Sequence, residues 1–61
     1  MKDYGKLILA LRAKLDISQE EMAKYLNVVF ATINRWENGR AIPSKRHMLQ
    51  IDELCKKYKV E

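Results

Sequence analysis

The chain has 61 residues, of which 48% are hydrophobic, and its 12 Lys and Arg residues outnumber its 8 Asp and Glu residues. A chain of this length forms one small domain, here residues 1–61, and needs most of its apolar side chains for the core, so we expect no enzyme pocket and no cofactor. The basic excess suits an anionic partner, although an ordinary solvated surface explains it equally well at this point.

The first predicted helix covers about residues 3–15. Its apolar residues follow the i, i+3, i+4, i+7 spacing of an amphipathic helix, and Lys6 and Lys14 lie on the other side. These apolar residues are Tyr4, Leu7, Ile8, Leu11 and Leu15. We therefore predict that this face packs against the core.

A second helix is predicted over about residues 19–25. Ser18 followed by Glu21 matches a capping box, in which each residue satisfies a backbone N–H of the other. Asn27 follows the helix, where the chain must turn, and asparagine tolerates the left-handed backbone conformation better than most residues. The buried residues of this helix would be Met22, Ala23 and Leu26.

A third helix is predicted over about residues 29–37. It ends before Gly39, which suits the left-handed position that follows a helix C-terminus. On a helical wheel of 100° per residue centred on Ile33, Val29, Trp36 and Glu37 lie within about 60° of the buried direction. The outward residues are Ala31, Arg35 and Asn38, with Thr32 and Asn34 at the flanks.

The start of the third helix is unusual, because it opens with Val28, Val29 and Phe30. Val29 stands at the N-cap, where a serine or threonine would contribute about 1 kcal/mol. Phe30 lies about 60° from the wheel centre, at the border of the core. We expect its ring to pack partly on the protein and partly to face a partner.

The fourth helix is predicted over about residues 44–58, with Ser44 as its N-cap. Its apolar stripe is Met48, Ile51, Leu54, Cys55 and Tyr58. His47 and Cys55 are about 12 Å apart on such a helix, so they cannot share a metal ion, and we expect no metal site. The single cysteine and the absence of a leader or long apolar run favour a reduced, cytoplasmic protein without a membrane segment.

These elements give an all-α fold of four helices, and residues 18–38 have the spacing of a helix-turn-helix. In that motif the second helix enters the major groove of DNA. A generic pair of antiparallel helices has the same punctuation, so the pattern by itself leaves both interpretations open.

Several short segments resemble the lambda-repressor-like, Xre/Cro-type helix-turn-helix family of bacteria and phages. The resemblance covers about residues 7–55 and combines a glutamine that opens the second helix, an alanine at its centre, an isoleucine in the third helix and a Pro-Ser restart. The matching segments are Ser18-Gln19-Glu20-Glu21-Met22-Ala23, Leu26-Asn27-Val28, Thr32-Ile33-Asn34-Arg35-Trp36-Glu37-Asn38-Gly39-Arg40 and Pro43-Ser44.

This resemblance implies a sequence-specific double-stranded DNA-binding protein, and it assigns roles to individual residues. The implied base-reading residues are Phe30, Ala31 and Arg35, with Asn34 close by. The implied DNA-backbone contacts are Gln19, Thr32, Asn38, Arg40, Ser44, Lys45 and Arg46. The family pattern also implies a structural ion pair between Arg12 and Glu37.

Side-chain chemistry independently favours part of this set. Arginine makes bidentate contacts with guanine, asparagine with adenine, and an alanine methyl contacts the thymine methyl, so Arg35 and Asn34 are the leading base readers. Gln19 opens a helix, where free N–H groups and the positive dipole end attract a phosphate.

Two alternatives to a transcriptional regulator remain at this level. The fold also serves protein-interaction modules, such as antitoxin-like partners or assembly domains, and these residues could be the DNA-targeting part of a longer protein. Most relatives carry a fifth helix or a further segment that pairs protomers, whereas this sequence stops at Glu61. A homodimer on a palindromic site and a monomer on a half-site therefore both stay open.

Overall fold

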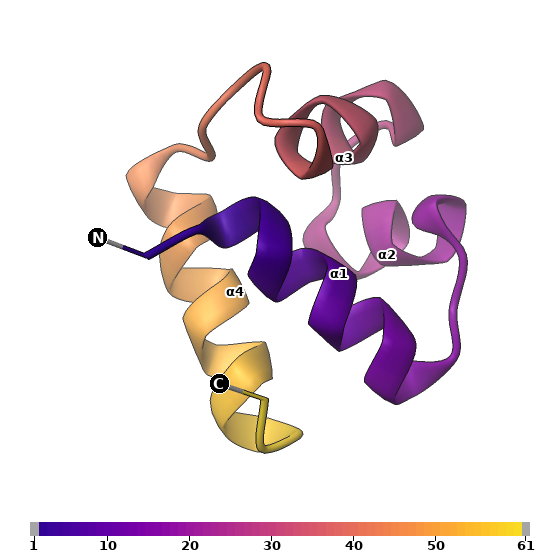
Figure 1. The fold of residues 1–61 in the computed structure, drawn as a ribbon, viewed down its shortest axis with the longest axis vertical. Helices are drawn as coiled ribbons and strands as arrows, with labels where there is room; N and C mark the ends of the chain where they lie inside the picture. The colour runs from indigo at the N-terminus through magenta and orange to yellow at the C-terminus, as the bar shows by residue number, and fades with distance from the viewer. Residues whose placement is uncertain (1, 61) are drawn as a thin grey trace.

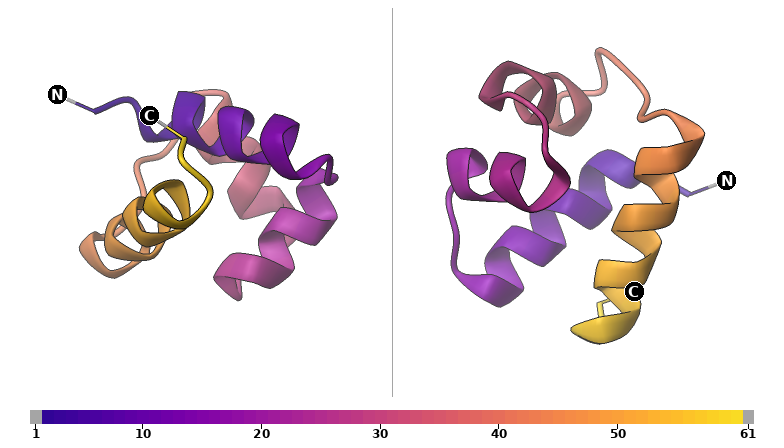
Figure 2. Two further views of the ribbon diagram at one scale, coloured as in Figure 1. Left: turned by 90° about the horizontal axis from the view of Figure 1, so that it is seen from below. Right: turned by 180° about the vertical axis from the view of Figure 1, so that it is seen from behind.

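The computed structural model describes residues 2–60. Its helices are α1 (Tyr4–Leu15), α2 (Gln19–Leu26), α3 (Phe30–Glu37) and α4 (Lys45–Lys57). In Figure 1, α1 runs across the molecule between α4 on one side and the α2–α3 pair on the other, and the right view of Figure 2 shows the same order from behind. The predicted all-α fold of four helices is confirmed, and each predicted boundary lies within one residue of the observed one.

Three of the four helices begin at a side chain that caps them. Asp3 accepts a hydrogen bond from the Lys6 N–H, and Ser44 accepts one from the His47 N–H. Ser18 and Glu21 form the predicted capping box. α3 is the exception, because its N-cap residue Val29 makes no side-chain hydrogen bond.

The C-termini of these helices share one geometry. After each helix one residue has a positive φ, and the next residue returns its N–H to a carbonyl in the last turn, as in a Schellman motif. The positive-φ residues are Asp16, Asn27, Gly39 and Lys59. Asn27 and Gly39 behave as predicted, whereas the left-handed conformations of Asp16 and Lys59 were not predicted; aspartate adopts this conformation occasionally, and lysine rarely.

The core lies where the four helices meet. Its buried residues are Ile8, Leu11, Met22, Ala23, Leu26, Ile33, Trp36, Ile51 and Cys55. Ile33 is fully buried, in agreement with its position at the centre of the wheel. Val29 is 67% exposed, so its predicted place on the core side is wrong. The reason is that Val29 has an extended backbone and precedes the helix, so the helical angle does not apply to it.

Gly5 allows α1 to approach the end of α3 closely. A Cβ atom built on Gly5 would lie 2.5 Å from the backbone oxygen of Trp36 and 3.4 Å from the Cα of Glu37. Because the near atom belongs to the backbone, no side-chain rotation could relieve such a clash. The absence of a side chain at Gly5 therefore sets how near α1 lies to α3.

A small polar cluster ties the start of α1 to α4. Asp52 accepts a hydrogen bond from Lys2 Nζ at 2.9 Å and one from the Tyr4 hydroxyl at 3.2 Å. The bond from Lys2 lowers the pKa of Asp52 and raises that of Lys2, while desolvation, followed by the bond to Asp52, raises the pKa of Tyr4. α4 is thus held against α1 by charge as well as by the apolar core.

Candidate nucleic-acid interface

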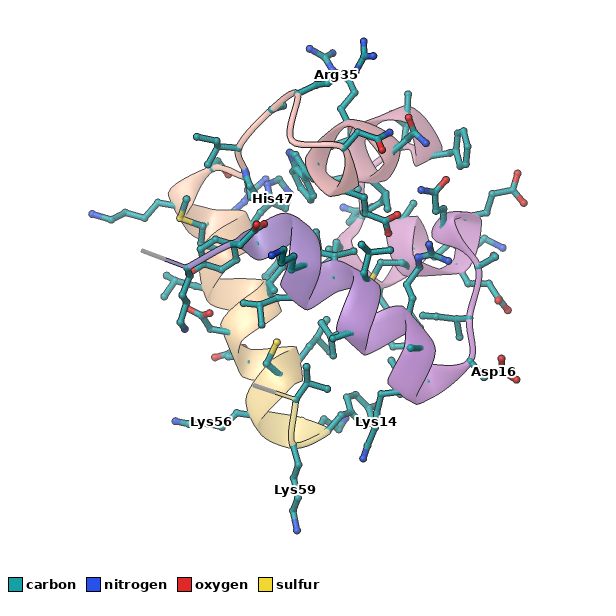
Figure 3. All side chains as sticks on the ribbon, in the orientation of Figure 1. Lys14, Asp16, Arg35, His47, Lys56 and Lys59 are labelled. Carbon is teal, nitrogen blue, oxygen red and sulfur yellow. The ribbon has the colours of Figure 1, made fainter. Side chains whose placement is uncertain are left out.

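The outward face of α3 is open to solvent. Ala31, Arg35 and Asn38 are exposed, while Thr32 and Asn34 are half-buried at the flanks, as the wheel predicts. In Figure 3 the Arg35 side chain extends away from the body of the molecule, at the end opposite to Lys56 and Lys59. This face is therefore accessible to a large partner.

Phe30 is the first residue of α3 and is 49% exposed. The other half of its surface is covered by the protein, which agrees with the border position expected from the wheel. Val29, directly before it, is exposed as well. The N-terminal end of the outward face is therefore apolar, whereas its C-terminal end carries Arg35 and Asn38.

Positive charge follows this face into the next segment. Arg40, Lys45 and Arg46 are exposed like Arg35, and residues 22–51 contain a single carboxylate, Glu37. The Glu37 side chain is only 5% exposed and is already paired with Arg12. Little negative charge from this segment therefore opposes an approaching polyanion.

The N-terminal ends of the helices differ in charge. The first turns of α3 and α4 contain no acidic residue, and α4 places Lys45 and Arg46 at the positive end of its own dipole. Such a charge pattern costs stability until an anion is near. α2 carries Glu20 and Glu21 in its first turn, which makes its N-terminus, next to Gln19, less suited to a phosphate than the sequence suggests.

α4 begins directly beside the end of α3. The rings of Trp36 and His47 are 5.2 Å apart between centroids, and Trp36 is buried. Ser44 lies 2.9 Å from His47 Nδ1 and also caps α4, so its hydroxyl is engaged within the protein. This packing fixes the N-terminus of α4 relative to the C-terminus of α3, the two places where the basic residues gather.

Arg12 and Glu37, the expected ion pair, are in direct contact. Arg12 Nε donates to Glu37 Oε2 at 2.8 Å, and Arg12 Nη2 donates to Oε1 at 3.1 Å. Arg12 also donates to the backbone oxygen of Ile17 at 3.3 Å. The pair therefore joins α1 to both the end of α3 and the loop before α2.

Sequence reasoning missed a second set of contacts around Glu37. Gln19 Nε2 donates to Glu37 Oε1 at 2.7 Å, and Gln19 Oε1 accepts from Asn34 Nδ2 at 3.4 Å. Asn34 Oδ1 in turn accepts from Asn38 Nδ2 at 3.1 Å. Three residues expected at the DNA, Gln19, Asn34 and Asn38, are thus brought together by hydrogen bonds within the protein. No spacing rule relates Gln19 to Asn34, so this link could not be predicted from the sequence pattern.

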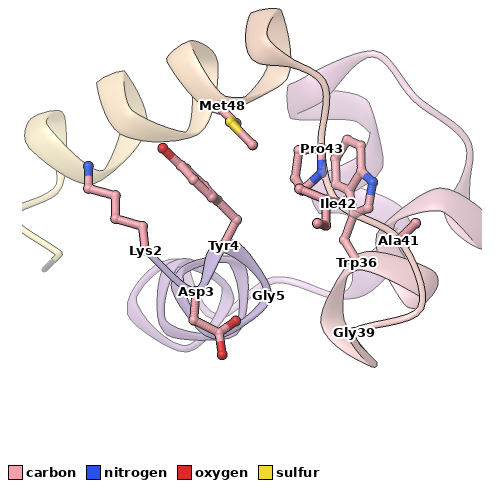
Figure 4. Close-up of a pocket in the computed structure, with 10 residues that line it drawn as sticks. All are labelled: Lys2, Asp3, Tyr4, Gly5, Trp36, Gly39, Ala41, Ile42, Pro43 and Met48. Carbon is pink, nitrogen blue, oxygen red and sulfur yellow. The ribbon is translucent and has the colours of Figure 1, made fainter.

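A groove of about 480 Å³ lies between the start of α1, the end of α3 and the loop before α4. Figure 4 shows its lining, with Tyr4, Trp36, Ile42 and Met48 around it. The charged residues of the lining already have partners, since Lys2 pairs with Asp52 and Asp3 caps α1. The groove therefore lacks the free convergent polar groups that orient a small ligand.

Within residues 2–60, no group of three or more His, Cys, Asp or Glu side chains is placed to hold a metal ion. None of the helices in this part of the chain has the length and apolarity needed to cross a membrane.

A helix-turn-helix family model matches residues 8–60, which is most of the chain. The proteins that this model describes are DNA-binding domains, typically those of transcriptional regulators, and are not typically enzymes. The comparisons with curated proteins and with solved structures give no significant match. The arrangement of α2 and α3, the positive charge from α3 to the start of α4 and this match agree, and the chain belongs to the lambda-repressor-like, Xre-type helix-turn-helix family.

Proposed function

We propose that this chain binds double-stranded DNA sequence-specifically as a cytoplasmic transcriptional regulator without catalytic activity, placing α3 in the major groove. The observation that carries the proposal is the outward face of α3, where Arg35 is exposed while Glu37, the single carboxylate of residues 22–51, has a side chain that is 5% exposed and paired with Arg12. Membership of a DNA-binding family supports the same function.

Base reading would fall to the residues that project from α3. Arg35 can form a bidentate contact with guanine O6 and N7, and the Ala31 methyl suits the methyl group of thymine. Phe30, which is partly exposed, lies at the start of the helix, where its ring would contact a second thymine methyl. Asn34 lies at the edge of this face, with its amide hydrogen-bonded to Gln19 and Asn38.

Phosphate contacts would flank these readers and fix the register of the protein on the duplex. Arg40, Lys45 and Arg46 supply the positive charge, and the acid-free N-terminus of α4 supplies a favourable dipole. The polar residues proposed at the backbone with them are Gln19, Thr32, Asn38 and Ser44.

The decisive experiment is selection of bound sequences from a random DNA pool at two salt concentrations. We expect enrichment of a defined site, and, if about five phosphates are neutralised, a slope near −4 to −5 for log K against log salt. A palindrome would indicate a homodimer, and a half-site would indicate a monomer. No enrichment together with a slope near zero would overturn the proposal.

Arg35→Ala tests the assignment to α3. We expect the variant to keep its fold and to lose about 5- to 150-fold of discrimination at one base pair. Lys56→Ala is a matched control, because Lys56 is also an exposed cation and lies at the other end of the molecule. An equal effect of the two changes would mean that α3 does not read bases.

A protein-interaction module is the second candidate, and one observation favours it. Val29 and Phe30 are two neighbouring exposed apolar residues at the start of α3, and such a surface also suits a protein partner. In that case the folded chain would enrich no DNA sequence in the selection, and Arg35→Ala would leave its weak DNA binding unchanged.

A further inference from the structure

A chain of hydrogen bonds crosses three helices beneath the outward face of α3. It starts at Arg12 on α1, passes to Glu37 on α3 and Gln19 on α2, and returns to α3 at Asn34 and Asn38. The donor–acceptor distances along it are 2.8, 2.7, 3.4 and 3.1 Å. The two helices of the helix-turn-helix are thus linked by side chains as well as by their apolar contact.

The donor and acceptor roles in this series of hydrogen bonds follow from Glu37, at its buried end. The Glu37 carboxylate is 5% exposed and accepts from both Arg12 and Gln19, so it can only act as an acceptor toward Gln19. The Gln19 amide nitrogen must then face Glu37, and its oxygen faces Asn34. Asn34 therefore offers its amide nitrogen to Gln19 and its oxygen to Asn38.

This order matters for Asn34, because a bidentate contact with adenine uses both its amide nitrogen and its amide oxygen. In the folded protein each of these atoms already has a partner. Turning the amide to a base would break its side-chain hydrogen bonds to Gln19 and Asn38. Arg35, the next residue, has no side-chain hydrogen bond to any residue from 2 to 60, so its guanidinium is free to contact a base.

We propose, on the basis of the DNA-binding function above, that Asn34 and Gln19 are positioning residues rather than base readers. Arg12 holds Glu37, Glu37 holds Gln19, and Gln19 holds Asn34 at the edge of the exposed side of α3. These bonds keep α3 at one angle to α2. Base discrimination then belongs to Arg35, with Phe30 and Ala31, and Asn34 contributes affinity without preferring a base.

Side-chain amide signals of the ¹⁵N-labelled wild-type protein test this assignment directly. On titration with a duplex carrying the selected site, backbone signals of α3 should shift. The Asn34 NH₂ protons should keep their contacts to Gln19 and show no nuclear Overhauser effect to a base. A contact between these protons and an adenine would overturn the proposal.

The variants Asn34→Ala, Gln19→Met and the double variant test it by binding. We expect Asn34→Ala to weaken binding a few-fold for all sequences alike, with the ranking of the four bases unchanged at every position. Adding Asn34→Ala to Gln19→Met should cause no further loss, because the link is already broken. A fall of about 5- to 150-fold in discrimination at one base pair on Asn34→Ala would identify Asn34 as a reader.

Gln50→Ala is the matched control, since Gln50 is a half-buried amide on α4, lies outside the residues proposed to contact DNA, and makes no side-chain hydrogen bond within residues 2–60. Urea unfolding of the same variants separates the two proposals. If the wild-type protein enriches no DNA, the proposed function fails, whereas coupling between Gln19 and Asn34 in unfolding still reports on the link itself. Additive effects in both unfolding and binding would mean that the two residues do not act together.

Discussion

Arg12 and Glu37 meet side by side, with Arg12 Nε 2.8 Å and Nη2 3.1 Å from the two carboxylate oxygens. The contact fixes the last residue of the proposed recognition helix to the last turn of α1. Because the Glu37 side chain is 5% exposed, while that of Arg12 is 23% exposed, the carboxylate depends on its partners more than the guanidinium does. The two single variants should therefore differ in cost.

Arg12→Met should destabilise the protein by about 2–4 kcal/mol, because it leaves a buried carboxylate with Gln19 as its remaining donor. Glu37→Gln should cost less, since the amide stays neutral in the same place. The measurement is urea unfolding of both single variants and the double variant. We expect the double variant to lose less than the two single losses together, and strictly additive losses would contradict a coupled pair.

Gly5→Ala should destabilise the fold by about 1–3 kcal/mol, although alanine favours helices over glycine by about 1 kcal/mol. The reason is steric, because the new Cβ would lie 2.5 Å from the Trp36 backbone oxygen. Gly39→Ala is the matched control, with a φ of +73° and open space around it, so its cost would come from backbone strain alone. Thermal unfolding measures both, and a gain in stability for Gly5→Ala would show that α1 can shift at no cost.

Val29→Ser should stabilise the protein by about 0.5–1 kcal/mol by giving α3 the cap that it lacks. The loss of the valine methyl groups costs little, because Val29 is 67% exposed. Val28→Ser is the natural comparison, since Val28 packs against the core and should lose stability when it becomes polar. A destabilising Val29→Ser would mean that its methyl groups already contribute to packing.

Asp52→Asn should remove part of the acid sensitivity of folding. The hydrogen bond from Lys2 lowers the pKa of Asp52 below its ordinary value of 3.8. The Asp52 contribution is therefore complete above pH 3.8 and is lost as the pH falls below that value through the lowered pKa. Unfolding free energies of the wild type and the variant between pH 2 and 6 should converge at the acid end. Parallel curves across this range would show that Asp52 does not titrate with folding.

Phe30→Ala should affect DNA preference more than folding. Phe30 is 49% exposed, so we expect its truncation to lower the unfolding free energy by only about 1 kcal/mol. A thymine preference at one position should weaken as well, because the ring supplies the apolar contact. Base selection with the variant is the measurement. A loss of stability with unchanged site preference would make Phe30 a packing residue alone.

The sequence by itself determined the features that depend on neighbouring residues. Helix periods, the Ser18–Glu21 capping box and the turns at Asn27 and Gly39 are local, and the structure places all of them as predicted. The same local reasoning predicted which side chains of α3 are buried and which are exposed around Ile33. It was wrong at Val29, because a residue with extended backbone before a helix does not follow the angle of that helix.

Only the tertiary structure decided the contacts between distant segments. The close approach of the Trp36 backbone to Gly5 depends on where the end of α3 packs against α1. The hydrogen bonds of Asp52 with Lys2 and Tyr4 depend on how α4 packs beside the start of α1. The link from Gln19 to Asn34 depends on the crossing of α2 and α3, which no single helix encodes. Local propensity fixes which face a helix presents, whereas the packing of whole helices decides which side chains on that face remain free.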